Sequence, residues 1–309
     1  MDSVAKRLED WFAEVRRPMP WRLRPTPYGC WLSEIMMQQT TYAAVLPYYE
    51  RFLKRFPTVE RLAEADEGDV LKAWEGLGYY ARARNLLKAA KEVAKAARWP
   101  KTAAEWAALP GVGPYTAAAL SSVLDGERTP VVDGNVARVF SRVWKLDDDF
   151  SNQPNRAKLA ARLQPEIDAC RVPGDFNQAL MELGATVCTP KSPDCGKCPL
   201  ASACAARRDG TQAAYPVKRS RKELPIRRVT SVIVKDEKGR VLLVQNREGG
   251  LLKGLWELPT VERTDDVTQV FSHFRLEQTN FGAVRTDAAF RDPKTVPLTT
   301  ATRKALGLK

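Results

Sequence analysis

The sequence predicts a mainly α protein that carries a small, mostly β second domain. Residues 1–210 place apolar side chains at helical spacing almost throughout and show little strand-like alternation. Residues 211–228, TQAAYPVKRSRKELPIRR, combine two prolines, clustered basic residues and few apolar ones, which is the composition of a linker. Short β-like runs follow. We therefore expect a helical domain over 1–210, a basic linker over 211–228 and a second domain over 229–309.

Helix-start signals support the first domain. Thr102 and Glu105 in TAAEWAAL form the pattern of a capping box, in which a hydroxyl and a carboxylate satisfy free amide groups. Asp66 is expected to open DEGDVLKAWEGL in the same manner. The segment ARARNLLKAAKEVAKAA, residues 81–97, has apolar residues at helical spacing with Lys and Arg on the other face. These segments predict three of the helices.

The region after the linker has a different pattern. RVTSVIVKDEKGRVLLVQNR, residues 228–247, predicts two strands around a Lys-Gly turn, a β-hairpin. Further short β-like runs are LWELPTV, FSHFRLEQ and FGAVR, and the tail TTATRKALGLK predicts a helix.

Charge and composition narrow the class of protein. Lys and Arg number 49 against 37 Asp and Glu, a net charge of +12, which favours a polyanionic partner because neutralised phosphates release counterions. A well-solvated basic protein is the alternative. Histidine occurs once, at His273, which excludes nearly all His-based catalysis.

No apolar run approaches the roughly 20 residues of a membrane helix, and the N-terminus lacks a signal-peptide layout. We expect a soluble, intracellular protein without membrane association.

Four of the six cysteines lie in CTPKSPDCGKCPLASAC, residues 188–204, spaced C-x6-C-x2-C-x5-C. In a reducing compartment such crowding suggests metal or cluster ligation rather than disulfides. A structural zinc site usually has two close pairs separated by a longer loop, whereas one compact loop suits an iron–sulfur cluster. We expect the cluster, with zinc as the alternative because thiolates accept both.

Three further segments contain candidate functional residues. LPGVGPYTAAAL, residues 109–120, predicts a tight glycine turn that leads into a helix beginning at Pro114, whose amides and dipole can face a phosphate. Asp133 in VVDGNVARVFSR precedes a predicted helix, and Glu34 in WLSEIMMQQT has apolar neighbours that would raise the pKa of its carboxyl. Taken singly, these features are more typical of a packed glycine turn, a helix cap and a solvated helix position.

Together these strings resemble the MutY adenine glycosylases, base-excision enzymes of the helix-hairpin-helix superfamily, closely over residues 10–205 and more loosely from 228 onward. The resemblance implies a helix-hairpin-helix DNA glycosylase fold with an iron–sulfur cluster loop and a small C-terminal α+β Nudix-like domain. It implies a 4Fe–4S cluster that is structural and contacts DNA, held by Cys188, Cys195, Cys198 and Cys204. It also implies phosphate contacts through Gly111, Val112, Gly113 and Lys191.

The resemblance assigns the chemistry to Glu34, Asp133, Tyr115 and Asn135. Glu34 would protonate the departing adenine, and Asp133 would stabilise or capture the oxocarbenium-like sugar. Bifunctional relatives carry a lysine at the position of Tyr115, and a tyrosine cannot form their Schiff base. The protein is therefore expected to remove a base and leave the abasic strand uncut.

The resemblance also implies the substrate contacts. Tyr79 in GLGYYARARN would stack into the duplex, and Gln39 would fill the gap left by an extruded base. The remaining contacts are Arg17, Met19, Trp21, Gln178 and Glu182 toward adenine, and Phe271, Ser272 and His273 toward 8-oxoguanine. An ordinary core aromatic, a surface amide and a packed histidine are the alternatives for Tyr79, Gln39 and His273.

The C-terminal region departs from the family pattern. Eleven residues, Thr260 to Val270, separate GLWELP from FSH, where family members have a longer segment with a helix. No Nudix-type run of paired glutamates occurs, so we expect no nucleotide pyrophosphatase activity.

The expected function is that of a monofunctional adenine DNA glycosylase of base excision repair, acting on adenine opposite 8-oxoguanine or guanine in double-stranded DNA. We expect a monomer in the cytoplasm of a bacterium, associated with the nucleoid. Two alternatives are an endonuclease III-like lyase that acts on oxidised pyrimidines and a non-catalytic lesion-binding or redox-responsive DNA protein.

Overall fold

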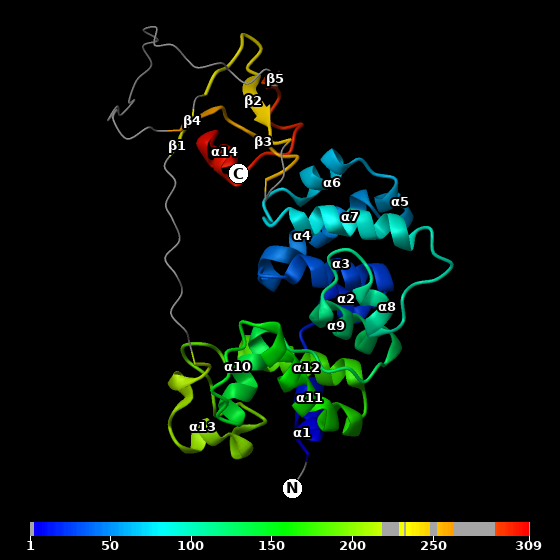
Figure 1. Ribbon diagram of the computed structural model, residues 1–309, viewed down its shortest axis with the longest axis vertical. Coiled ribbons are helices and arrows are strands. Elements are labelled where there is room, and N and C mark those ends of the chain that lie inside the picture. The colour runs from blue at the N-terminus through cyan, green and yellow to red at the C-terminus, as the bar shows by residue number, and fades with distance from the viewer. Residues whose placement is uncertain (1–2, 218–228, 232, 248–251, 263–287, 309) are drawn as a thin grey trace. The chain divides into compact units, whose positions relative to one another are not determined.

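The structure is a computed structural model that describes residues 3–217, 229–231, 233–247, 252–262 and 288–308 (Figure 1). The chain divides into two compact units, and each is built from two separate stretches of sequence. Met1–Gln38 and Lys95–Arg221 form the first unit, and Gln39–Ala94 and Lys222–Lys309 form the second. The helices between residues 39 and 94 thus group with the C-terminal region rather than with the other helices.

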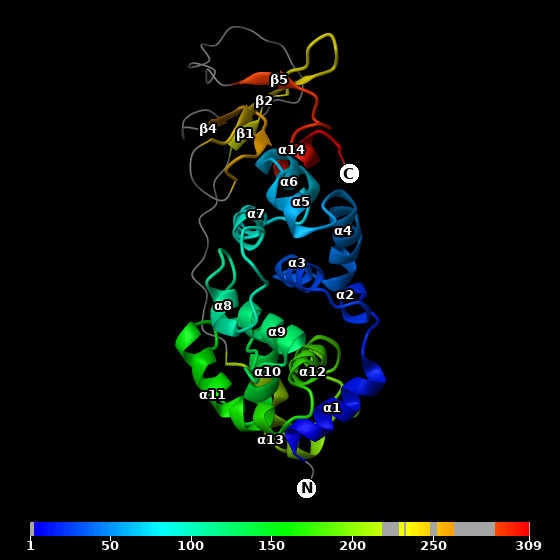
Figure 2. The same cartoon turned by 90° about the vertical axis from the view of Figure 1, so that its right-hand side faces the viewer.

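The first unit is helical. Its elements are α1 (Val4–Val15), α2 (Pro20–Leu23), α3 (Pro27–Met37), α8 (Ala103–Ala107), α9 (Pro114–Asp125), α10 (Gly134–Val143), α11 (Gln153–Ala169), α12 (Pro173–Thr186) and α13 (Ala205–Arg208), with 3-10 turns at Ala201–Ala203 and Gln212–Ala214. Helix α9 packs against α3, α8 and α12, and α12 packs in turn against α1 and α10 (Figure 2). Apolar side chains from α1 and α9 to α12 bury one common core.

Capping decides where several of these helices begin. Thr102 accepts the amide of Glu105, whose carboxylate reaches back to the cap, so the predicted capping box is confirmed. Pro114 occupies the first turn of α9, where its missing N–H costs nothing, and this prediction is also confirmed.

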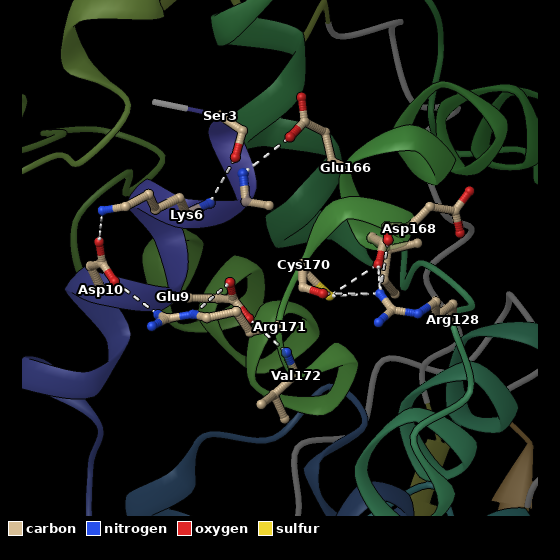
Figure 3. A network of polar contacts seen from close by, with 12 residues as sticks. Ser3, Lys6, Glu9, Asp10, Arg128, Glu166, Asp168, Cys170, Arg171 and Val172 are labelled. Atoms are coloured by element: carbon tan, nitrogen blue, oxygen red, sulfur yellow. Dashed lines mark hydrogen bonds and ion pairs between the residues drawn. The ribbon is translucent and has the colours of Figure 1, made fainter. Parts of the chain in front are cut away.

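A polar network fastens the first helix to the rest of its unit (Figure 3). The buried carboxylate of Glu9 accepts the main-chain amide of Val172 at 2.8 Å, and Glu166 of α11 accepts the amide of Ala5 at 3.1 Å. The guanidinium of Arg128 donates to the carbonyl of Ile167, in the last turn of α11, and to that of Cys170, its C-cap. Main-chain groups at both ends of the α11–α12 connection therefore have partners.

The second unit contains four helices from its first stretch: α4 (Tyr42–Arg55), α5 (Val59–Ala63), α6 (Glu67–Trp74) and α7 (Ala81–Val93). Phe52 packs against Phe56 and Trp74, with ring centroids 4.9 and 6.0 Å away. Asp66 is the N-cap residue of α6, but its side chain makes no capping hydrogen bond, so the prediction that it caps in the manner of Thr102 is wrong. The extended backbone and an acidic first turn suffice to start this helix.

The C-terminal stretch of the second unit forms two small antiparallel sheets and a helix. Strand β1 (Val229–Ser231) pairs with β4 (Thr260–Glu262), and β2 (Val241–Gln245) lies between β3 (Trp256–Glu257) and β5 (Ala289–Arg291). The predicted turn forms at Asp236–Gly239, but β1 pairs with β4 rather than with β2, so the hairpin is shorter than predicted. The predicted C-terminal helix is α14 (Thr300–Ala305).

No helix within the described ranges is long and apolar enough to cross a membrane.

Candidate active site

Glu34 lies on α3 among buried neighbours that include Ser33, Ile35 and Met36. Loss of hydration raises the pKa of its carboxyl to about 7. A hydrogen bond from Tyr115 and the nearby charge of Arg22 oppose this rise, whereas the charge of Asp133 adds to it. A substantial fraction of the group therefore keeps its proton near neutral pH, in the direction that its apolar neighbours predict.

Tyr115 is the second residue of α9 and lies two residues after Gly113, the N-cap of that helix. Burial raises the pKa of its phenol well above the usual value, and the carboxyl groups of Glu34 and Asp133 raise it further. Its hydroxyl lies 2.9 Å from the Sδ of Met181 on α12. The phenol thus stays neutral and can donate to a carboxylate.

Asp133 is the N-cap of α10, so the reading of this residue as a helix cap also holds. Its Oδ1 accepts the amide of Val136 at 2.8 Å, and its Oδ2 accepts the side-chain amide of Asn135 at 2.9 Å. Burial raises the pKa of the carboxyl, and these hydrogen bonds offset part of the rise. The charge of Asp133 also raises the pKa of Glu34, so the titrations of these two carboxyl groups are coupled.

Two residues that the sequence analysis did not single out position Asp133. Asn177 is fully buried on α12 and binds the amide of Val131, the carbonyl of Thr129 and the hydroxyl of Ser122. It thereby fixes the segment that leads to Asp133. Gly184 allows the approach of α12 to α10, because a Cβ there would come within 2.5 Å of Asn135. Neither residue has a local sequence signal, since each acts on a distant segment.

A second group of predicted residues comes together around Glu182. Its carboxylate is almost completely buried on α12 and accepts two hydrogen bonds from Arg17. Arg22 also donates to it, at 3.0 Å, and this residue was missed although it follows Trp21 directly. Burial lowers the pKa of Arg22, and the charges of Glu182 and Glu34 oppose that shift. Arg22 therefore acts electrostatically on both carboxyl groups.

The other residues of this group are Met19, Trp21 and Gln178. Met19 and Trp21 are buried at the start of α2. Gln178 lies one turn before Glu182 on α12, on the same face of that helix.

The predicted phosphate-binding turn connects α8 to α9. Gly111 has a φ of +80°, a left-handed conformation that favours glycine, and nothing lies within 4 Å of the position that a Cβ on Gly113 would take. The amide of Val112 donates to the carbonyl of Leu109, so it closes the turn. Lys191, in the cysteine loop, is exposed.

The four cysteines of the loop line one cavity together with Arg142, Arg207 and Gln212. Burial raises the pKa of Cys198 to about 11, and the three other cysteines contribute to the rise. Four thiols at one cavity are the donor set that an iron–sulfur cluster needs, so the residues fit this group. No set of three or more potential ligands in the described part of the chain is arranged to hold a single metal ion.

Arg142 was not predicted and is the main polar anchor of this loop. It is 2% exposed and donates to the Sγ of Cys188 at 3.3 Å and to the carbonyls of Thr189 and Pro190. Its Nε donates to the carbonyls of Gln212 and Tyr215. The loop is thus held by a buried cation from α10.

The second unit contains the two residues that are predicted to enter the duplex, Tyr79 to stack there and Gln39 to fill the gap left by the extruded base. Gln39 and Tyr79 have φ values of +58° and +49°, and Lys145 is the one other non-glycine residue with positive φ in the described ranges. Tyr79 is 57% exposed, which is unusual for an aromatic side chain. Such backbone conformations gather at functional sites. Phe271, Ser272 and His273 lie outside the described residues.

The fold and these sites define a class that the comparisons with known proteins identify. The model of the HhH-GPD superfamily of base excision DNA repair proteins matches residues 32–165. The solved structure of a thermostable thymine-DNA glycosylase superposes with a TM-score of 0.59 and 27% identity, covering 66% of this chain and 95% of that one. The fold is therefore that of the helix-hairpin-helix DNA glycosylases.

Curated relatives narrow the class. An adenine DNA glycosylase from Homo sapiens is 37% identical over 82% of this chain and 56% of its own length. One from Buchnera aphidicola subsp. Schizaphis graminum is 32% identical over 80% of this chain and 71% of its own length. The chain belongs to the adenine DNA glycosylase family. It spans about half the length of several curated relatives that it matches, 56% for the human one and 49% for one from Arabidopsis thaliana.

Proposed function

We propose that the protein is a monofunctional adenine DNA glycosylase that removes adenine mispaired with 8-oxoguanine or guanine in duplex DNA and so begins base excision repair. The observation that carries this proposal is the carboxyl of Glu34, whose pKa is raised to about 7 beside Tyr115 and Asp133. Near neutral pH a large fraction of Glu34 is protonated and can act as a general acid.

The proposed reaction divides the work between two carboxyl groups. As the bond between the sugar and adenine breaks, its electrons pass to the purine, which takes the proton of Glu34. The sugar becomes cationic, and the carboxylate of Asp133, held by Val136 and Asn135, would stabilise it with its negative charge. Water then adds to the sugar and releases a proton.

Tyr115 supports the monofunctional assignment. A lyase needs an amine that attacks the sugar and forms an imine, and a phenol cannot do so. Its neutral hydroxyl instead donates to Glu34. The strand would remain uncut at the abasic site.

The group around Glu182 supports adenine as the leaving base. A buried carboxylate can accept a hydrogen bond from an exocyclic amine, and Arg17 and Arg22 hold it in one orientation. Met19, Trp21 and Gln178 supply apolar and amide contacts. A pocket built to pair an amine rejects a base that lacks one.

DNA binding rests on the α8–α9 turn, the cysteine loop and the second unit. We propose that Gly111, Val112, Gly113 and Lys191 contact phosphates, which positions the protein without reading sequence. Cys188, Cys195, Cys198 and Cys204 would hold a 4Fe–4S cluster, which stabilises this loop when bound. Tyr79 and Gln39 would enter the duplex, and Phe271, Ser272 and His273 would contact 8-oxoguanine.

Single-turnover assays on duplexes with adenine opposite 8-oxoguanine, guanine or thymine test the proposal. We expect strand scission after alkali treatment and only in the two mispaired duplexes. Scission without alkali, or a covalent adduct trapped by borohydride, would instead identify an endonuclease III-like lyase. If the protein binds the mispaired duplexes but releases no adenine, it would instead be a non-catalytic lesion-binding protein.

A further inference from the structure

The turn that carries Tyr79 connects α6 to α7 and is bonded to the C-terminal stretch of its own unit. Glu75, at the end of α6, accepts the amide of Leu298 at 3.0 Å. Tyr80, at the start of α7, donates from its hydroxyl to the carbonyl of Leu298 at 3.4 Å. Two side chains on either side of the turn therefore hold both main-chain polar groups of one residue.

Ion pairs reinforce this contact. Lys72 lies 2.7 Å from the carboxylate of Glu75 and donates to the carbonyl of Val296 at 2.9 Å. Arg303 of α14 approaches the same carboxylate at 3.9 Å. Positive charge from both stretches of the unit thus lies close to Glu75. These cations stabilise its carboxylate, which has lost most of its contact with water.

Burial makes this contact costly to break. The exposed fractions are 8% for Glu75, 3% for Tyr80 and 0% for Leu298. A buried polar group that is left without its hydrogen-bond partner destabilises the folded state. Leu298 also belongs to the small apolar core of the C-terminal stretch, together with Trp256 and Leu258. A shift of that core therefore moves the partner of Glu75 and Tyr80.

Tyr79 needs external support for its conformation. Its φ is +49°, and the turn also contains Gly76 and Gly78 with φ values of +101° and +71°. Left-handed backbone is unfavourable for a bulky residue and persists only where its surroundings enforce it. The side chain of Tyr79 is exposed and its ring contacts Arg82, at 5.5 Å, so the enforcing contacts come mainly from the neighbouring residues of the turn.

We propose that Glu75 and Tyr80 are positioning residues through which the C-terminal stretch braces the Tyr79 turn and so promotes extrusion of the target base. The inference rests on the proposed role of Tyr79 as the residue that enters the duplex. A braced turn presents Tyr79 before DNA arrives, whereas a loose turn has to be ordered during base extrusion. The C-terminal stretch would then act on extrusion through Leu298 as well as on recognition.

A double-mutant cycle tests whether Glu75 acts through Tyr79. Glu75→Ala, Tyr79→Ala and the double variant are compared in single-turnover release of adenine opposite 8-oxoguanine. We expect Glu75→Ala to slow release roughly ten-fold in the Tyr79 protein and less than about two-fold in the Tyr79→Ala protein, because coupled residues are not additive. Equal losses in the two backgrounds would overturn the brace.

Extrusion is measured separately from bond cleavage. In the Glu34→Gln background, 2-aminopurine beside the target adenine becomes brighter when its neighbour leaves the stack. We expect Glu75→Ala and Tyr80→Phe to reduce this signal, and Glu75→Gln, which retains an acceptor for Leu298, to recover most of it. Glu64→Ala, an exposed carboxylate on the same unit, is the matched control and should change nothing.

The outcomes separate this inference from the function on which it rests. If the native protein releases no adenine from any mispair, the proposed function is wrong. If Tyr79→Ala releases adenine at the native rate, the proposed role of Tyr79 is wrong, and the proposal that Glu75 and Tyr80 brace its turn is wrong with it. If Glu75→Ala unfolds at the assay temperature, Tyr80→Phe, which retains its packing, has to show the same non-additivity or the brace is wrong.

Discussion

The two units place their candidate functional residues in opposite environments. In the first unit, Glu34, Tyr115 and Asp133 are groups whose pKa values are raised by the loss of water. In the second unit, Gln39 and Tyr79 are exposed and have left-handed backbone conformations. Proton transfer needs a controlled pKa, whereas entry into a DNA duplex needs a side chain held away from its own core. The same chain meets these demands by partial burial in one unit and by left-handed backbone conformations in the other.

This contrast predicts different sensitivities to mutation. In the first unit, an isosteric change that removes a proton should be severe although the shape is kept. At Tyr79 in the second unit, loss of the aromatic ring should matter, and loss of its hydroxyl should not.

The largest effect is expected for Glu34→Gln. The amide keeps the shape of the side chain but cannot supply the proton, so single-turnover release of adenine should fall by about 10²-fold or more, the usual contribution of a general acid. Affinity for the mispaired duplex should persist. Glu14→Gln, an exposed carboxylate on α1, is the control. Native release rates in Glu34→Gln would remove Glu34 from the mechanism.

Tyr79→Ala should have the next largest effect. Extruding a base costs a few kcal/mol, and loss of the stacking ring should slow adenine release by roughly ten-fold. Tyr79→Phe retains the ring and should stay near the native rate. Single-turnover rates for both variants provide the measurement, and an equally slow Tyr79→Phe would show that the hydroxyl rather than the ring is needed.

The pKa of Glu34 predicts two effects of pH. Because the protonated acid is the active form, the single-turnover rate should fall as pH rises through about 7. The raised pKa also means that the folded protein keeps a proton that the unfolded chain loses above about 4.5, so the stability contributed by this group declines as pH rises from there through 7. Glu34→Gln should therefore raise the melting temperature at about pH 8.5 and leave it nearly unchanged at about pH 4.

Calorimetry at these two pH values measures this difference, with Glu14→Gln as the reference. An equal shift of the melting temperature at both pH values would show that packing rather than charge is responsible.

The smallest effect compares two helix caps, one in each unit. Thr102→Ala removes the capping hydrogen bond of α8 and should cost about 1 kcal/mol of unfolding free energy. Asp66→Ala should cost less, because its side chain makes no such bond at α6. Urea unfolding of each variant gives the two values. A larger loss for Asp66→Ala would reverse the comparison.

Much of the fold could be predicted from local patterns. The capping box at Thr102 and the helix start at Pro114 depend on residues within one turn of each other, so their chemistry is fully present in the sequence. The partner of β1 could not be predicted in this way. A strand of three residues pairs equally well with several others until the distant chain is in place.

The candidate site shows the same limit. Local apolar neighbours were enough to predict a raised pKa at Glu34. Arg142, Asn177 and Glu75 were not predicted, because each side chain binds main-chain groups of a segment distant in sequence. A buried polar residue has no local periodicity that reveals its partner.

The order of residues in this chain fixed the helical character, the spacing of four thiols and the presence of two carboxyl groups in motifs that could be recognised. Those features arise from interactions between near neighbours. Three-dimensional packing set the pKa of Glu34 and Asp133, enclosed the cysteines with Arg142 and joined the helices of residues 39–94 to the C-terminal stretch. Apolar neighbours in the sequence indicated the direction of the shift at Glu34, but hydrogen bonds and contacts between remote segments exist only after the chain has folded, which is why no local pattern could have supplied their partners.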